Sequence, residues 1–205
     1  MNEQGPVALV AGVGRGTGGA ISRRLAAGGY RVALLARSEK RLKEFEAELS
    51  GSLALPCDIT DPAALDEVLG RCRAELGEPE IVVHNAARGV WGSFLDIEPS
   101  EMEANFQVNT MSRLHLGRAV APAMVAAGRG AIIVTGNTSA WRGKPDFSGF
   151  APTKAAQRIL AEAMARELGP KGVHVAYVVI DAVIDLRWTR KRFPNLPDER
   201  FAKTD

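Results

Sequence analysis

Short apolar runs alternate with longer segments of helical period along most of the chain. The runs are almost continuously apolar, which is typical of strands buried on both faces of a parallel sheet. We predict strands at residues 7–11, 32–36, 53–57, 81–85, 131–135 and 173–180. The alternation indicates an α/β fold of the Rossmann type, a doubly wound parallel sheet in three layers with helices on both faces.

Polar residues mark the starts of the predicted helices. Ser38 and Asp61 are suitable N-caps, and a proline follows Asp61, as is common at the first position of a helix. A long helical pattern covers residues 99–128, in which we expect Pro122 to kink or divide the helix. A further helix is predicted from about residue 150 to residue 168.

The composition is that of one ordinary globular domain. The 205 residues are 46% hydrophobic and 24% charged, with a net charge of +2, which excludes a disordered chain and gives no reason to expect a nucleic-acid partner. We find no signal-peptide pattern and no apolar run near the ~20 residues of a membrane span, so we expect no membrane partner and a cytoplasmic location. Cys57 and Cys72 lie in unrelated contexts, which predicts reduced structural thiols and no metal site.

A glycine-rich turn follows the first predicted strand and leads into a helix. Such a turn lets the backbone approach a pyrophosphate, and the free amides of the helix start favour its charge. The alternative is a tight turn that binds nothing. A Walker loop is excluded because no Lys-Ser or Lys-Thr pair follows the glycines. The expected cofactor-binding residues of the turn are Gly12, Gly14, Arg15, Gly16, Thr17 and Gly18.

The tip of the second predicted strand bears on the choice of cofactor. An acidic residue at this place holds a ribose hydroxyl, whereas an arginine accommodates a 2′-phosphate. The chain has Arg37 here and no carboxylate, and Arg15 in the glycine turn is a second candidate for the same phosphate. We therefore predict NADP(H) in preference to NAD(H), the alternative being that both arginines are merely solvated.

The spacing Gly12-x-x-x-Gly16-x-Gly18 resembles the glycine turn of the short-chain dehydrogenase/reductase family, and further matches follow in order over nearly the whole chain. The resemblance implies that Asp58 and its neighbour Ile59 hold the adenine. It also implies that Asn85 and Ala86, in HNAA, support the cofactor, and that Asn109 and Lys154 are active-site residues. Family members usually add a helix and a seventh strand after the substrate loop; the chain ends before them, so we expect the last strand to be lacking.

Three positions depart from the family pattern. Phe150 stands in place of the tyrosine that exchanges the substrate proton, and Asn137 stands in place of the serine, with Thr138 or Ser139 as alternatives in a shifted register. Asp181 stands in the Pro-Gly turn beside the nicotinamide. General acid catalysis is typically worth ~10²- to 10⁴-fold, so such a site is slowed rather than abolished.

A substitute acid has three candidates, which the sequence leaves open: Lys154 directly, a water held by Asn109, or Ser148. For the three histidines a structural role is preferred. Trp91, Trp141 and Trp188 follow predicted strands, where they either line an apolar substrate cleft or pack in loops.

The predicted function is an NADP(H)-dependent oxidoreductase that transfers hydride to or from a small carbonyl or alcohol substrate. The alternative is a catalytically impaired NADP(H)-binding regulatory or scaffolding protein. We divide the chain into a dinucleotide-binding domain at residues 1–184 and a segment at 185–205, charged and without sustained period, that forms a substrate loop or tail. The resemblance also implies a homodimer or homotetramer.

Overall fold

The computed structural model describes residues 5–204, which contain one six-stranded parallel sheet. The strands lie in the order β3-β2-β1-β4-β5-β6, which is the doubly wound Rossmann order. This confirms the predicted fold class, and each predicted strand lies within two residues of an observed one. The strands are β1 (Val7–Ala11), β2 (Arg31–Ala36), β3 (Leu53–Pro56), β4 (Ile81–His84), β5 (Gly130–Asn137) and β6 (Val173–Ile180).

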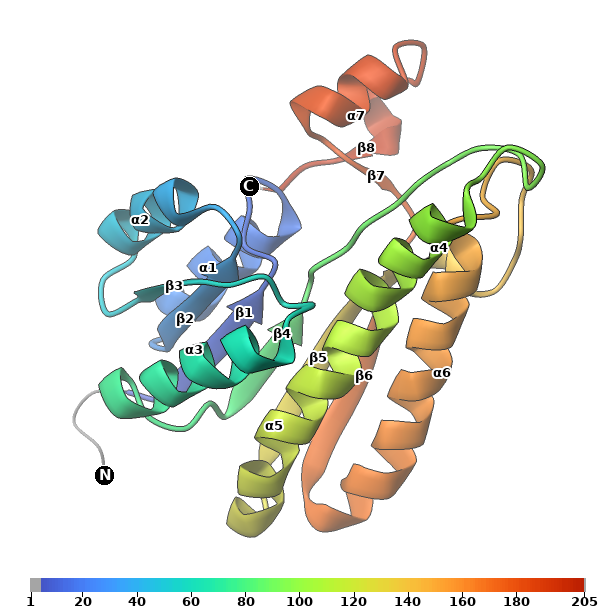
Figure 1. The fold of residues 1–205 in the computed structure, drawn as a ribbon. Helices are drawn as coiled ribbons and strands as arrows, with labels where there is room; N and C mark the ends of the chain where they lie inside the picture. The colour runs from blue at the N-terminus through green and yellow to red at the C-terminus, as the bar shows by residue number, and fades with distance from the viewer. Residues whose placement is uncertain (1–4, 205) are drawn as a thin grey trace.

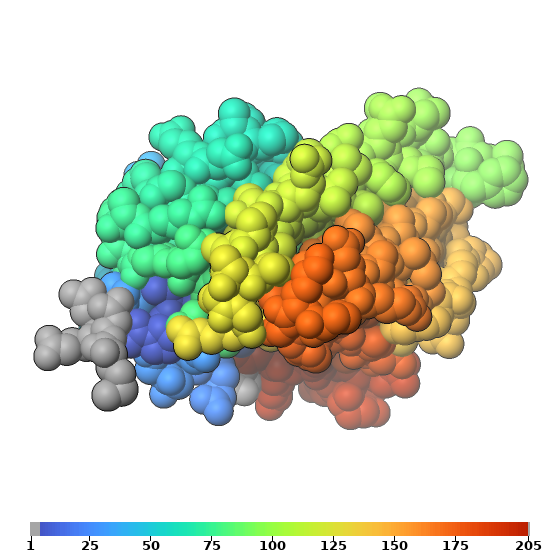
Figure 2. Space-filling view, turned by 90° about the horizontal axis from the view of Figure 1, so that it is seen from below, coloured from blue at the N-terminus to red at the C-terminus, as the bar shows by residue number. Residues whose placement is uncertain are grey.

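Helices cover both faces of the sheet, and the sheet separates two hydrophobic cores (Figure 1). The core beneath α1 and α2 contains Val10, Leu34 and Phe45, and the core on the opposite face contains Leu9 and Ile132. Viewed from below, α3, α5 and α6 form a continuous layer (Figure 2). The helices are α1 (Thr17–Ala27), α2 (Glu39–Glu48), α3 (Pro62–Glu75), α5 (Ser112–Ala127) and α6 (Ala151–Leu168).

The long helical pattern before β5 is divided, but not at Pro122. Helix α4 (Pro99–Phe106) passes through a π-helical turn at Gln107–Met111 into α5, which continues through Pro122. The structure therefore contradicts a division of the helix at Pro122. This proline lies on the exposed side of α5, where water can solvate the carbonyl that loses its partner. The π-helical turn contains Asn109, and such turns are frequent at functional sites.

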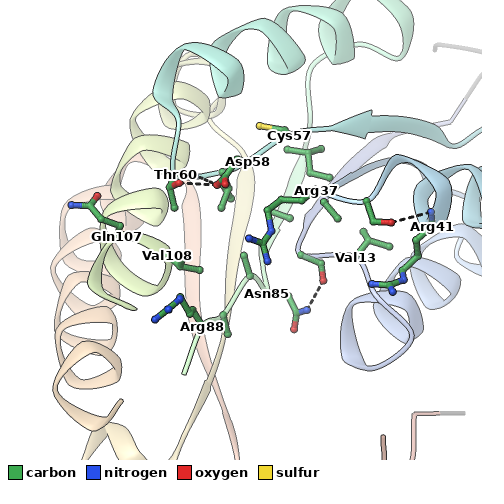
Figure 3. A pocket seen from close by; sticks show the side chains of 18 of the residues that line it. Val13, Arg37, Arg41, Cys57, Asp58, Thr60, Asn85, Arg88, Gln107 and Val108 are labelled. Carbon is green, nitrogen blue, oxygen red and sulfur yellow. Dashed lines mark hydrogen bonds between the residues drawn. The ribbon is translucent and has the colours of Figure 1, made fainter. Parts of the chain in front are cut away.

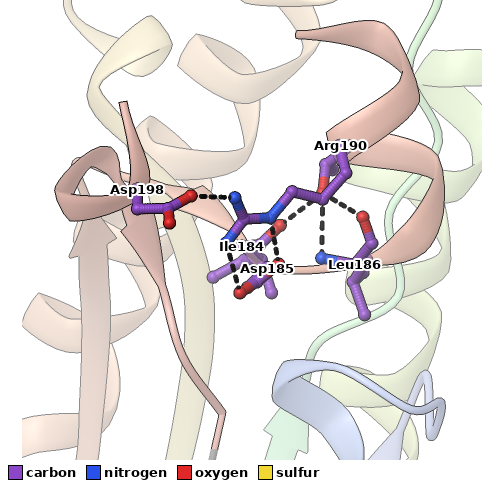
Figure 4. Close-up of polar contacts among 6 residues, drawn as sticks. Ile184, Asp185, Leu186, Arg190 and Asp198 are labelled. Carbon is purple, nitrogen blue, oxygen red and sulfur yellow. Dashed lines mark hydrogen bonds and ion pairs between the residues drawn. The ribbon is translucent and has the colours of Figure 1, made fainter. Parts of the chain in front are cut away.

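The charged segment at the end of the chain is folded back over the carboxyl ends of the strands (Figure 1). It contains α7 (Arg187–Arg192) and the short strand β8 (Phe201–Ala202), which pairs with β7 (Val183–Ile184). Arg190 binds both carboxylate oxygens of Asp185, at 2.7 and 2.8 Å, contacts Asp198 and lies 3.9 Å above the ring of Phe201 (Figure 4). The β7–β8 pair joins residues on either side of the predicted boundary.

Both cysteines are free and buried, and burial raises the pKa of each thiol to about 11. Within residues 5–204, no helix is both long enough and apolar enough to cross a membrane.

Gly12 is a backbone requirement of the fold. Its φ is +94°, and a Cβ at this position would lie 2.4 Å from the backbone nitrogen of Ala86. We expect Gly12→Ala to lower the free energy of unfolding by about 3 kcal/mol or more, measured by urea denaturation, because both strain and overlap result. The matched control is Gly14→Ala in the same turn, where a Cβ meets nothing within 4 Å. A loss for Gly14→Ala as large as that for Gly12→Ala would contradict this account.

Candidate active site

The site is built around the side chain of Asn85, which follows β4. Its Nδ2 donates to the carbonyl of Gly12 at 2.9 Å, and its Oδ1 accepts from the hydroxyl of Thr135 at 2.9 Å. One amide thereby ties together the carboxyl ends of β1, β4 and β5. In open α/β sheets ligands bind at this edge, at the point where the strand order reverses. That point lies here between β1 and β4.

A cavity of about 780 Å³ lies on one side of Asn85 (Figure 3). The arginines Arg37 and Arg41 lie at its edge near the start of α2, and Asp58 faces them from the end of β3. Asp58 accepts hydrogen bonds from the backbone and the hydroxyl of Thr60, which lower the pKa of its carboxyl, with a further contribution from Arg37. The predicted residues that line this cavity are Gly12, Arg37, Asp58, Ile59, Asn85 and Ala86.

The start of α1 is open to an anion. Ser38 and Asp61 cap α2 and α3 with their side chains, as predicted, whereas no side chain in the described part of the chain caps α1. Its first amides are thus left for a bound group, and the helix dipole favours a negative one. A Cβ on Gly14 would meet nothing within 4 Å, whereas a Cβ on Gly16 would lie 3.2 Å from the side chain of Leu186 and 3.5 Å from that of Ile184. Of the predicted turn residues, Gly14, Gly16 and Gly18 do not line this cavity or the second one described below.

A second cavity, of about 660 Å³, continues from the first and shares Asn85, Ala87 and Arg88 with it. The two cavities form one elongated cleft along the carboxyl edge of the sheet. The second cavity brings together predicted residues that lie far apart in sequence. These are Thr17, Asn137, Phe150, Lys154 and Asp181.

Lys154 is the central cation of the second cavity. Its side chain comes from the first turn of α6 and is almost completely buried, at 2% exposure. Its Nζ donates to the carbonyl of Thr135 at 3.3 Å and lies 5.9 Å from the centre of the Phe150 ring. Burial, together with the charge of Arg113, lowers the pKa of Lys154 to about 8. Both its charged and its neutral forms are therefore available near neutral pH.

The Asn109 side chain is held by three hydrogen bonds within the protein. Its Oδ1 accepts from the backbone nitrogen of Arg88, and its Nδ2 donates to the Arg88 carbonyl and to the hydroxyl of Thr153. It therefore joins the loop after β4 to the start of α6. Both hydrogens of Nδ2 are used in these contacts, which gives the side chain a positioning role.

The polar residues at the end of β5 and in the segment that follows make different contacts. Asn137 Oδ1 accepts from the backbone nitrogen of Ser139 at 3.2 Å, which leaves its Nδ2 as a donor. Thr138 donates to Asp181 at 2.9 Å and so is engaged by the predicted nicotinamide turn. Ser148 lines a separate hollow beside Trp141 and does not line the cleft.

Several residues differ from their predicted places or were missed. Arg15 is exposed, does not line either part of the cleft, and lies 3.9 Å from Glu44. Arg41 lines the first cavity beside Arg37 but was not predicted. The sequence signal that could have found it is its place three residues after the N-cap Ser38, in the first turn of α2.

His84 is completely buried, and burial lowers its pKa to about 3, which agrees with the structural role preferred for it. Within the described residues, no group of three or more His, Cys, Asp or Glu side chains is placed to hold a metal ion.

Fold and cleft together define an α/β protein of the nucleotide-binding Rossmann class. A family model described as short chain dehydrogenase matches residues 6–190. The chain belongs to this short-chain dehydrogenase family and is an oxidoreductase.

Individual relatives support the assignment. This chain is 33% identical to 3-oxoacyl-(acyl-carrier-protein) reductase FabG of Escherichia coli (strain K12) over 191 residues. The match covers 93% of this chain and 78% of that protein. D-erythrulose reductase of Gallus gallus is 34% identical over 176 residues, covering 85% and 70%. The crystal structure of a metagenomic short-chain oxidoreductase in complex with NADP matches with a TM-score of 0.83 at 29% identity, covering 98% of this chain and 95% of that one.

The Asn109 contacts predict a large effect on stability. Removing the amide in Asn109→Ala leaves two backbone groups of Arg88 without their partner, so we expect a loss of about 2–4 kcal/mol in the free energy of unfolding. Gln107→Ala, an exposed neighbour in the same π-helical turn, is the control and is expected to change stability by less than about 0.5 kcal/mol. Equal effects of the two changes in urea denaturation would show that the bridge contributes nothing.

Proposed function

We propose that this enzyme binds NADP(H) in the cleft and catalyses the reversible reduction of a carbonyl compound to an alcohol, with Lys154 as the proton donor. The observation that supports this most is the single cleft that joins paired arginines at one end to the uncapped start of α1 and a buried lysine at the other. When bound, the cofactor supplies or takes up a hydride at its nicotinamide ring.

The first cavity supplies the groups for the adenosine end. Arg37 and Arg41 offer two guanidinium groups to a 2′-phosphate, and guanidinium binds phosphate oxygens in pairs. Asp58 is held ionised by Thr60 and is placed to accept a hydrogen bond from the adenine. The backbone at Gly14 and Gly16, together with the start of α1, would hold the pyrophosphate.

The second cavity supplies the groups for the reacting end. Asn137 Nδ2 is a free donor that would bind the carbonyl oxygen of the substrate, and Thr138 orients Asp181, which would lie beside the nicotinamide of a bound cofactor. Holding two reactants in the correct geometry is worth roughly 7–11 kcal/mol of the barrier. Positioning alone therefore provides a large share of the rate.

Lys154 is the proposed source of the proton because Phe150, at the family's tyrosine position, has none to give. The ammonium is buried and has a pKa of about 8, so it releases a proton far more readily than a solvated lysine. Of the other acids considered, Ser148 lies outside the cleft and Asn109 is engaged by Arg88.

The arginines at the first cavity predict the cofactor preference. In Arg37→Ala we expect the dissociation constant of NADPH to rise by roughly tenfold or more, since one phosphate contact of this kind contributes about 1.5–3 kcal/mol. The dissociation constant of NADH, measured by the same fluorescence titration, should be nearly unchanged. A parallel weakening of both cofactors would place the arginine away from the 2′-phosphate. Exposed Arg24, on α1, provides the control change Arg24→Ala.

The proton source predicts the pH dependence and tests the function as a whole. NADPH oxidation over a panel of aldehydes and ketones should fall as pH rises through about 8, because Lys154 must be protonated to donate; alcohol oxidation should rise over the same interval. Lys154→Met should remove this transition together with most of the activity. Phe150→Tyr should increase reduction by roughly 10²-fold or more by restoring a phenol, whereas Phe106→Tyr, on exposed α4, should not.

The outcomes separate the components of the proposal. A protein that binds neither NADPH nor NADH contradicts the function. Turnover in Phe150→Tyr with none in the natural protein contradicts Lys154 as a sufficient donor and leaves the cofactor site intact.

A further inference from the structure

The outer part of the second cavity has an aromatic wall. The ring of Trp91 lies 5.5 Å from that of Phe150 and 6.4 Å from that of Trp188, centre to centre. Trp91 comes from the loop after β4, Phe150 precedes α6, and Trp188 belongs to α7. Three segments far apart in sequence thus pack their rings together at tilts of 40° and 38°, and the guanidinium of Arg192 lies 5.2 Å from the centre of the Trp91 ring. The exposed ring of Trp188 continues this cluster outward, a surface that suits a flat apolar group.

Three further cations line the same cavity. Arg142 and Lys144 come from the loop before α6, and Arg200 comes from the segment before β8. All three are exposed, and within residues 5–204 none of these side chains has an ion-pair partner. Their charges are therefore not neutralised by the protein.

These cations lie away from the cofactor end of the cleft. Arg142 and Lys144 also line a third hollow with Trp141 and Pro152, on the side opposite the cavity that holds Arg37. In contrast, Arg88 lines the junction with that cavity and is paired with Glu101 at 2.6 Å. The arginines of the first cavity would bind the cofactor phosphates. Arg142, Lys144 and Arg200 are therefore available to bind a different anion.

Acidic side chains are almost excluded from this cavity. Of the described residues that line it, Asp181 is the single carboxylate, and it accepts from Thr138. The chain as a whole has a net charge of only +2. Positive charge thus outweighs negative charge among the residues that line the substrate end of the cleft, which favours an anion there.

From this arrangement we infer that the substrate is an aromatic or similarly flat carbonyl compound, or the matching alcohol, that carries a carboxylate. The ring stacks against Trp91 and Trp188, and the carboxylate binds Arg142 and Lys144. The inference rests on the proposed function and adds to it the chemical class of the substrate.

The test uses four aldehydes that differ in ring and charge. They are 4-formylbenzoate, its methyl ester, 4-oxobutanoate and butanal, each measured for kcat/KM with NADPH. We expect 4-formylbenzoate to exceed both its ester and 4-oxobutanoate by tenfold or more. In parallel, calorimetry measures the binding of 4-carbamoylbenzoate and its methyl ester, which accept no hydride. The acid is expected to bind at least tenfold more tightly.

Variants assign the two contributions to residues. The double change Arg142→Gln and Lys144→Gln should remove the preference for the acids and leave the esters unchanged. Trp188→Ala should weaken both aromatic aldehydes about tenfold and leave butanal unchanged. Arg118→Gln, exposed on α5, controls for charge. Trp141→Ala is the control for removal of an indole. Trp141 is 55% exposed, against 54% for Trp188, and it does not line the cleft.

Failure of the substrate class is distinguishable from failure of the function. Turnover of the aldehydes without preference for ring or carboxylate overturns the substrate class while the oxidoreductase proposal stands. If NADPH does not bind but 4-carbamoylbenzoate binds in preference to its ester, and the double change abolishes that preference, the anion site stands and the proposed function falls. Equal binding of acid and ester overturns the inference whatever the cofactor does.

Discussion

The amide of Asn85 is the contact on which the rest of the site depends. By donating to Gly12 and accepting from Thr135, it fixes the ends of three adjacent strands relative to one another. The glycine turn can lie this close only because Gly12 has no side chain to meet Ala86. The cofactor cavity and the substrate cavity both include Asn85, so their continuity depends on one half-buried hydrogen-bonding group at the reversal of strand order.

Two buried cations, Arg113 and Lys154, form a second feature of the site, and within the described residues neither is paired with a carboxylate. Arg113 is almost fully buried, donates to the carbonyl of Gln157, and lowers the pKa of Lys154 by repulsion. The Arg113 Nε and both polar atoms of the Gln157 side chain lack partners within the described part of the chain. Unpaired buried groups of this kind reduce stability. Burial of the Lys154 ammonium, together with the positive charge of Arg113, lowers the pKa of Lys154 to about 8.

Phe150 links the chemistry of the cleft to its shape. A phenol at this position would be a polar group beside Lys154, whereas the phenylalanine ring packs against Trp91 and extends the apolar wall. Phe150 therefore contributes a ring to the apolar wall and no ionisable group beside Lys154. The fold keeps the remaining wall in place through the ion pairs of Arg190, which hold the α7 segment against β8.

The sequence by itself determined the strands and the helix caps at Ser38 and Asp61, because these depend on local periodicity and on short-range hydrogen bonds, and it indicated a doubly wound parallel sheet. It also determined that Phe150 has no proton to give. It did not locate the division of the long helical segment, which lies at the π-helical turn and not at Pro122, and it could not give the partners of Asn109, which lie in two distant segments. The pKa of Lys154, the aromatic wall and the outer cations were decided only by the tertiary structure, since burial and the meeting of separate loops are properties of the packed chain.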